Sequence, residues 1–225
     1  MANTHQKDKF DERQENIAHT VSETSEFFEK NKKVIWGAVI AVVVIGLGIF
    51  LYHRFVYQNQ VAEAMEQAYP AENLFMNGEY ELALNGDGNN LGFVAIIDQY
   101  GSKAGKSMPL YAGICELQLG NFDSALSYLK QYKGKEPVLA ARAKACEGDA
   151  YVGLGDYKSA VACYDAAIGM ADNVFVATYL LKQGLAYEAL GDKAAALKCY
   201  RTIEDQYPQA VESYDIYKYI SRVSE

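Results

Sequence analysis

The sequence predicts an all-α protein in which one N-terminal transmembrane helix precedes a solenoid of helix pairs. Two observations carry this prediction: an uncharged apolar segment at Val34–Tyr52, and a sequence pattern that occurs three times over residues 106–208. Half of the 225 residues are hydrophobic and only four are proline. Such a composition is sufficient to bury a core and is compatible with helices joined by short turns.

Charge and histidine content exclude several classes of function. The net charge is −8, so the chain lacks the basic surface that grips a phosphate backbone, and we expect no nucleic-acid partner. It has three histidines, two of them within the first 19 residues, which disfavours a histidine metal site or a catalytic triad. We expect no metal and no cofactor.

Residues 1–33 form a polar tail with six basic and seven acidic residues. We expect a solvated cytoplasmic tail. This tail is too long and too acidic to be the short basic leader of a signal peptide.

Residues 34–52 are the predicted transmembrane helix. As a helix this segment spans about 28 Å, close to the thickness of a bilayer hydrocarbon core. Trp36 and Tyr52 lie near its ends, where amphipathic rings favour the membrane interface. A buried core helix is the soluble alternative, but such helices are seldom apolar all round. The first Ala-x-Ala site after the segment, Ala62–Ala64, lies too far downstream for signal cleavage, so we expect an uncleaved anchor in the lipid bilayer.

The flanking lysines set the expected orientation. Lys30, Lys32 and Lys33 precede the span, whereas Arg54 alone follows it closely. Basic flanks stay on the cytoplasmic side. We therefore expect a single-pass protein of the bacterial inner membrane, with its N-terminus in the cytoplasm and its repeats in the periplasm.

Residues 53–105 are expected to hold a membrane-proximal helix and a degenerate first repeat. Ala62–Met76 has helical apolar spacing, and we expect Pro70 to bend or stop this helix. Leu91–Tyr100 is expected to be the second helix of the pair. Between them, Asn85–Asn90 lacks the glycine and glutamate that a calcium loop needs at its sixth and twelfth positions, and we interpret it as a surface turn.

Three in-register repeats occupy residues 106–208, with a period of 35 and then 36. The matching positions are Gly113, Gly148 and Gly184; Leu119, Leu154 and Leu190; Gly120, Gly155 and Gly191; and Ala125, Ala160 and Ala196. Small residues at these spacings let two antiparallel helices approach closely, and glycine at the turn permits the left-handed backbone that ends a helix.

These motifs resemble the tetratricopeptide repeat, a helix–turn–helix unit. The second repeat fits that pattern with Gly148, Tyr151, Gly155-Asp156-Tyr157, Ala160 and Ala167. The first repeat departs from it at Glu116, where an aromatic residue is usual, and the third at Ile203, where alanine is usual. Residues 209–225 follow as a capping helix, with an expected apolar stripe of Val211, Tyr214, Tyr217, Ile220 and Val223.

The resemblance implies a concave groove lined by the first helix of each repeat, and a peptide-binding role for it. The candidate groove residues are Leu110, Ile114, Leu117, Arg142, Asp149, Val152, Leu181, Leu185 and Glu188. One subclass of the family clamps a C-terminal carboxylate with Lys and Asn, but Leu110 and Ile114 occupy those positions here. In the alternative interpretation, these apolar residues pack on the domain's own helices or on a neighbouring subunit.

No catalytic motif is present, so we expect no enzyme. Cys115, Cys146, Cys163 and Cys199 form no CxxC pair, and we interpret them as small buried residues. Whether any of them pair as disulfides stays open at this point.

The whole layout resembles the YfgM-like family of ancillary subunits of the bacterial Sec translocon, which associate with a membrane-anchored periplasmic chaperone. The insertion Leu84–Asn90 also resembles membrane-anchored repeat proteins of the Bacteroidetes. The resemblance implies a scaffold in protein export, with translocon subunits and the chaperone as partners. The alternative is a structural subunit of another envelope complex, in secretion, gliding or outer-membrane assembly, with self-association also open.

Overall fold

A computed structural model describes residues 28–170 and 174–224 of the chain. It separates into two compact units, Met1–Gln58 and Asn59–Glu225, which are described one at a time. Most of the predicted cytoplasmic tail lies outside the described residues.

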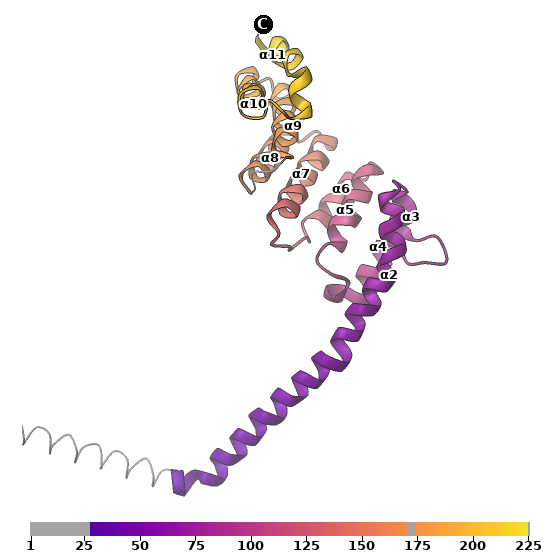
Figure 1. Cartoon of the computed structure of the whole chain (residues 1–225), viewed down its shortest axis with the longest axis vertical. Helices are drawn as coiled ribbons and strands as arrows, with labels where there is room; N and C mark the ends of the chain where they lie inside the picture. The colour runs from indigo at the N-terminus through magenta and orange to yellow at the C-terminus, as the bar shows by residue number, and fades with distance from the viewer. Residues whose placement is uncertain (1–27, 171–173, 225) are drawn as a thin grey trace, which may run out of the picture. The chain divides into compact units, whose positions relative to one another are not determined.

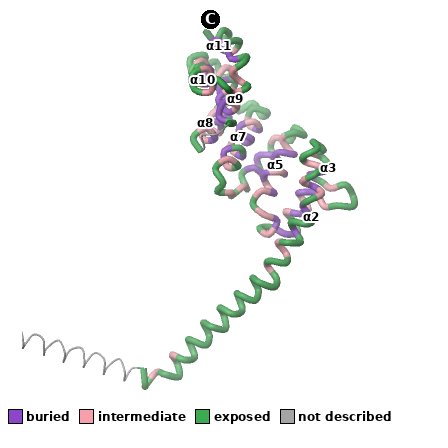
Figure 2. The backbone as a smooth tube through the Cα atoms, viewed as in Figure 1, coloured by how far each residue is buried: buried purple, intermediate pink, exposed green. Residues whose placement is uncertain are grey.

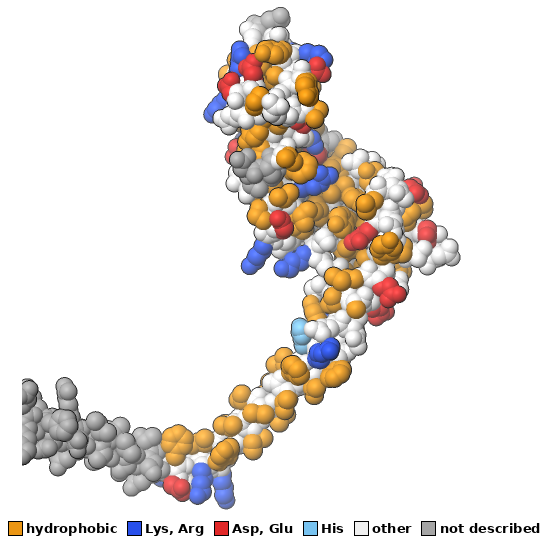
Figure 3. Space-filling model, in the orientation of Figure 1, with side chains coloured by type: hydrophobic (Ala, Val, Ile, Leu, Met, Phe, Trp, Pro, Cys, Tyr) orange, Lys and Arg blue, Asp and Glu red, His pale blue; other side chains and the backbone are white. Residues whose placement is uncertain are grey.

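The described part of the first unit, residues 28–58, is one long helix. Residues 28–52 are α-helical and are followed by a π-helical turn, η1 (His53–Tyr57). Its residues are coloured almost entirely as exposed in Figure 2, apolar side chains cover the face seen in Figure 3, and none of the most apolar window is buried. The helix is long and apolar enough to cross a membrane. Membrane anchors and signal sequences share this property, whereas the core helix of a soluble domain would be covered.

The second unit opens with three helices and a short 3-10 turn. These are α2 (Gln58–Met76), α3 (Tyr80–Asn85), α4 (Phe93–Tyr100) and η2 (Gly101–Ala104). The helix α2 continues through Pro70 to Met76, so the expectation that Pro70 stops it is wrong, whereas a bend at Pro70 stays a prediction. The buried alanines Ala64, Ala68 and Ala71 anchor one face of α2 in a core with α3, α4 and α5, and this burial offsets the missing hydrogen bond.

The loop Asn85–Asn90 is held by hydrogen bonds between its own residues. The Asp87 carboxylate accepts hydrogen bonds from the backbone N–H groups of Asn89 and Asn90, at 2.9 and 2.7 Å, and from the Asn90 side chain at 2.9 Å. These bonds, above all the one from the Asn90 side chain, lower the pKa of Asp87. The interpretation as a surface turn is confirmed.

Three helix pairs follow, stacked one after another (Figure 1). They are α5 (Met108–Gln118) with α6 (Phe122–Leu129), α7 (Pro137–Gly153) with α8 (Tyr157–Met170), and α9 (Val176–Ala189) with α10 (Lys193–Gln206). Each pair corresponds to one predicted repeat. We call α5, α7 and α9 the first helices, and α6, α8 and α10 the second helices.

The glycine pattern has the predicted physical cause. A Cβ added at Gly148 would lie 2.6 Å from the Tyr164 ring, and one at Gly184 would lie 2.4 Å from the Tyr200 ring. Only glycine admits these contacts between the first and second helices of a repeat. At the turns, Gly120, Gly155 and Gly191 have φ angles of 81°, 76° and 79°, the left-handed conformation expected at a helix end.

The C-terminal cap is present, but its predicted stripe is corrected. A 3-10 turn, η3 (Val211–Asp215), precedes α11 (Ile216–Ser224) and changes the helical phase. Ile216, Ile220 and Val223 are buried against α9 and α10, whereas Val211, Tyr214 and Tyr217 are exposed.

Candidate protein-binding surface

The first helices of the second and third repeats, together with α8, line a small pocket that we call the groove pocket. Val152 on α7 and Leu185 on α9 are the exposed apolar residues at this site, with 37% and 41% of their surface accessible. The pocket measures about 180 Å³. Its lining is Asp149, Val152, Tyr157, Tyr164, Lys182, Leu185 and Ala186. A space of this size fits one apolar side chain of a bound polypeptide.

Two predicted groove residues do not reach this surface. Leu110 and Ile114 on α5 are only 1% and 6% exposed, and they lie in a core cluster with residues of α6 and α7. The buried alanine at position 143 of α7 leaves room for them, so they fill the space between repeats instead of facing a ligand. Leu117 and Leu181 are half-buried beside core clusters of the same kind, whereas Arg142 is exposed.

Asp149, another predicted groove residue, joins the second repeat to the third. Its carboxylate accepts a hydrogen bond from the Tyr164 hydroxyl at 2.8 Å and forms an ion pair with Lys182 of α9, at 2.7 and 2.8 Å. Burial, together with the nearby Asp149 charge, raises the pKa of Tyr164 well above its usual value, so this hydroxyl stays a proton donor. Both members of the ion pair line the groove pocket, together with Val152 and Leu185.

Glu188 forms the corresponding junction between the third repeat and the cap. Arg222 of α11 donates two hydrogen bonds to its carboxylate, both at 2.7 Å, and the Tyr200 hydroxyl donates a third. Burial alone would raise the pKa of Glu188, but the bonds from Arg222 and Tyr200 outweigh it and lower the pKa. The Arg222 guanidinium also lies 5.0 Å from the centre of the Tyr219 ring.

Comparisons with known proteins agree with this geometry. Residues 147–211 match the family model described as tetratricopeptide repeat. Residues 147–211 therefore carry tetratricopeptide repeat sequence. A solved structure titled "Crystal structure of MamA protein" superimposes with a TM-score of 0.53 at 17% sequence identity, covering 74% of this chain and 87% of that one. At that identity the likeness shows the fold alone, and no curated protein matches the chain.

Within this tetratricopeptide domain, the cysteines are packing residues. All four are free thiols, and Cys115, Cys146 and Cys199 are buried. Burial raises the pKa of Cys115 to about 12 and those of Cys146 and Cys199 to about 11, which keeps the thiols protonated and weakly nucleophilic. Across the described residues, no group of three His, Cys, Asp or Glu side chains has the arrangement of a metal site.

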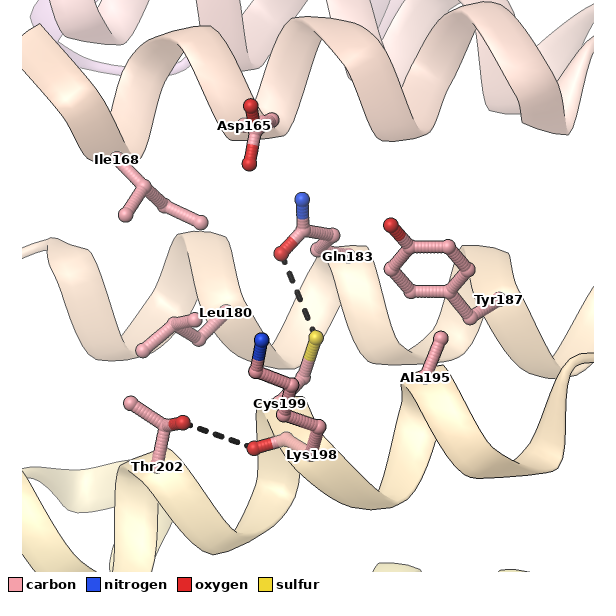
Figure 4. Close-up of a pocket in the computed structure, with 9 residues that line it drawn as sticks. All are labelled: Asp165, Ile168, Leu180, Gln183, Tyr187, Ala195, Lys198, Cys199 and Thr202. Atoms are coloured by element: carbon pink, nitrogen blue, oxygen red, sulfur yellow. Dashed lines mark hydrogen bonds between the residues drawn. The ribbon is translucent and has the colours of Figure 1, made fainter.

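The sequence reasoning missed a pocket on the second-helix face, between α8, α9 and α10 (Figure 4). It measures about 330 Å³, and Gln183 of α9, only 5% exposed, lies at its base. Asp165 and Ile168 of α8 border one side and Cys199 of α10 the other. The Gln183 amide donates a long hydrogen bond of 3.4 Å to the Val161 carbonyl and accepts one from the Cys199 thiol, also at 3.4 Å, an ordinary distance for sulfur.

One sequence signal marked this face. Glu147, 4% exposed, occupies the position of Gln183 one repeat earlier, and these two are the buried polar side chains of the described residues. Glu147 and Gln183 are polar residues at equivalent positions of two repeats, 36 residues apart, so the sequence alone could have marked this face.

Proposed function

We propose that this chain is a membrane-anchored scaffold on which other proteins assemble, without catalytic activity of its own. The carrying observation is a stack of repeats that leaves Val152 and Leu185 exposed at the groove pocket. One ion pair joins the second repeat to the third at this pocket, and another joins the third repeat to the cap. A preformed surface of this kind loses little conformational entropy on binding a peptide.

The apolar helix supplies the second half of the proposal. Its uncovered apolar side chains and its length support a role as a membrane anchor at residues 34–52. Anchoring confines the repeats to the membrane plane and raises their effective concentration toward membrane partners. The lysines at 30, 32 and 33 favour an N-terminus in the cytoplasm and repeats in the periplasm.

Within that role, we propose that the scaffold takes part in protein export and binds translocon subunits and a membrane-anchored periplasmic chaperone. The layout of tail, single span and repeats supports this assignment. A structural role in another envelope complex is the second candidate, and the pocket on the second-helix face favours it because it offers a further contact surface.

Site-specific photo-crosslinking in native membranes tests both candidates. A photoreactive amino acid replaces Leu185 in the groove pocket, and a matched variant carries it at Leu190, which is similarly exposed but lies at a helix end outside the pocket. We expect crosslinks from position 185 to export components and far fewer from position 190. Crosslinks to another envelope machine would move the function to the second candidate, and equal crosslinking from both positions would contradict the groove assignment.

A double substitution, Val152→Asp with Leu185→Asp, gives the complementary loss-of-function test. Both side chains are exposed, so the domain should keep its helix content, while burying two carboxylates in an apolar contact should remove partner binding. Unchanged binding by the folded double variant would contradict the groove assignment.

A further inference from the structure

A second pocket lies on the second-helix face one repeat earlier, between α6, α7 and α8. It measures about 260 Å³, and we call it the basic pocket because Lys130, Lys133 and Lys144 line it. The remaining lining is mainly apolar: Leu129, Tyr132, Gly134, Ala140, Ala143 and Met170, with Glu147 at the base.

The three lysines retain hydrogen-bonding capacity. Lys144 forms an ion pair with Glu147, at 2.7 and 2.8 Å. Lys130 donates to the Tyr151 hydroxyl at 3.0 Å, and Lys133 donates to the Lys130 carbonyl at 3.1 Å. An ammonium group has three donors, and three cations here face one carboxylate, so the pocket carries a net positive charge.

This charge stands out from the rest of the chain. Residues 130–147 hold five basic and two acidic residues, in a protein whose net charge is −8. The fold does not require these lysines. The repeat-equivalent pocket of Figure 4 forms with Asp165, Ile168 and Leu180 at the corresponding positions. Gathering like charges opposes folding, so a ligand that neutralises them gains free energy that the other pocket does not offer.

We propose that the basic pocket receives a glutamate or aspartate side chain from an acidic segment of a partner protein. The carboxylate would lie among the three ammonium groups, and its methylene groups would contact Ala143 and Met170. The apolar wall favours an amino-acid side chain over inorganic phosphate or a lipid headgroup, and the Glu147 carboxylate disfavours a doubly charged anion. The site lies on the second-helix face, apart from the groove pocket, so it adds a second contact to the proposed scaffold.

The test uses the full-length chain in phosphatidylcholine nanodiscs, with ¹³C-labelled methionine methyl groups. The probe is the peptide acetyl-Gly-Leu-Glu-Leu-Glu-Gly-amide, and its control replaces both glutamates by glutamine. We expect the acidic peptide to shift the Met170 methyl resonance saturably, and the glutamine peptide to bind about tenfold or more weakly, the equivalent of one charged contact. Equal affinity for the two peptides would overturn the proposal.

Matched variants locate the site. Lys133→Glu should weaken binding of the acidic peptide about tenfold or more, and Lys133→Gln should weaken it less. Lys193→Glu makes an equal charge change at an exposed position of α10 outside the pocket, and it should change the affinity by less than about twofold. Far-ultraviolet circular dichroism checks that each variant is folded. If Lys133→Glu does not fold, the affinity of Lys133→Gln decides the test. Unchanged affinity in both Lys133 variants would overturn the proposal, as would tighter binding of inorganic phosphate or phosphatidylglycerol vesicles at the same methyl group. Binding should survive Val152→Asp with Leu185→Asp, which separates this result from failure of the groove.

Discussion

The second and third repeats share a backbone design but differ in the chemistry that they display. In both repeats, a glycine on the first helix packs against a buried tyrosine on the second helix, and the tyrosine hydroxyl donates a hydrogen bond to a carboxylate of the first helix. That carboxylate also forms an ion pair with a basic side chain of the next element, α9 for the second repeat and α11 for the third. The acids differ in position: Asp149 precedes its tyrosine by 15 residues, and Glu188 by 12. The same mechanical function is thus achieved one helical turn apart.

On the second-helix face the two repeats diverge completely. The pocket against the second repeat gathers lysines around Glu147, whereas the pocket against the third places Asp165 and Ile168 around Gln183. Packing positions therefore repeat because the helices must fit together, while pocket positions are free to vary because they face solvent or a partner. In the proposed function, the positions that break the repeat set the binding preference.

The largest expected effect comes from deleting the shared tyrosines. Tyr164 and Tyr200 are 1% and 0% exposed, and Tyr164→Ala or Tyr200→Ala should each destabilise the domain by about 3–5 kcal/mol. Tyr→Phe at the same sites removes only the hydroxyl and should cost about 1–2 kcal/mol. Urea unfolding followed by circular dichroism measures both. A phenylalanine variant as unstable as the alanine variant would show that the acid contacts, not ring packing, hold the repeats together.

A smaller effect tests the charge difference between the two pockets. Lys144→Leu, which installs the residue found at Leu180, leaves the Glu147 carboxylate buried without its cation and should cost about 1–3 kcal/mol. Adding Glu147→Gln removes the unpaired charge and installs the residue found at Gln183, which should restore stability to within about 1 kcal/mol of the natural protein. Urea unfolding of the single and double variants gives the comparison. If the double variant is no more stable than the single one, the two pocket bases are not interchangeable.

Sequence reasoning succeeded where sterics decide the outcome. The glycines at 113, 148 and 184, and those at the turns, predicted the helix pairs because close approach and left-handed backbone leave few alternatives to glycine. It failed where packing outweighs local preference. Pro70 did not stop α2, and the buried stripe of α11 runs through Ile216, Ile220 and Val223, which leaves Tyr214 and Tyr217 exposed.

The candidate site was predictable only in part. Val152 and Leu185 line the groove pocket as the repeat register implies, but Leu110 and Ile114 sink into the core because their neighbours across the repeat interface are small. Ion pairs between repeats, such as Asp149 with Lys182, depend on which side chains meet across a helix interface. That information is absent from the spacing within one repeat.

The smallest expected effect is a pH-dependent contribution of the Glu188–Arg222 ion pair, which joins the third repeat to the cap, to the stability of the domain. The pKa of Glu188 is lowered from its ordinary 4.5, so its ionised form stabilises the folded state. This contribution is fully present above pH 4.5 and is lost as the pH falls below that value through the lowered pKa. Because Arg222 is 52% exposed, solvent screens the ion pair, and we expect it to contribute at most about 1 kcal/mol to the stability of the folded state.

The variant Glu188→Gln tests this contribution, because it removes the titrating group while keeping a hydrogen-bond acceptor for Tyr200. The stability difference between the natural protein and this variant, measured by urea unfolding from pH 7 to pH 3, should therefore shrink as the pH falls. A difference that stays constant over this range would mean that Glu188 acts through packing, and that the charge of Arg222 contributes nothing to holding the cap.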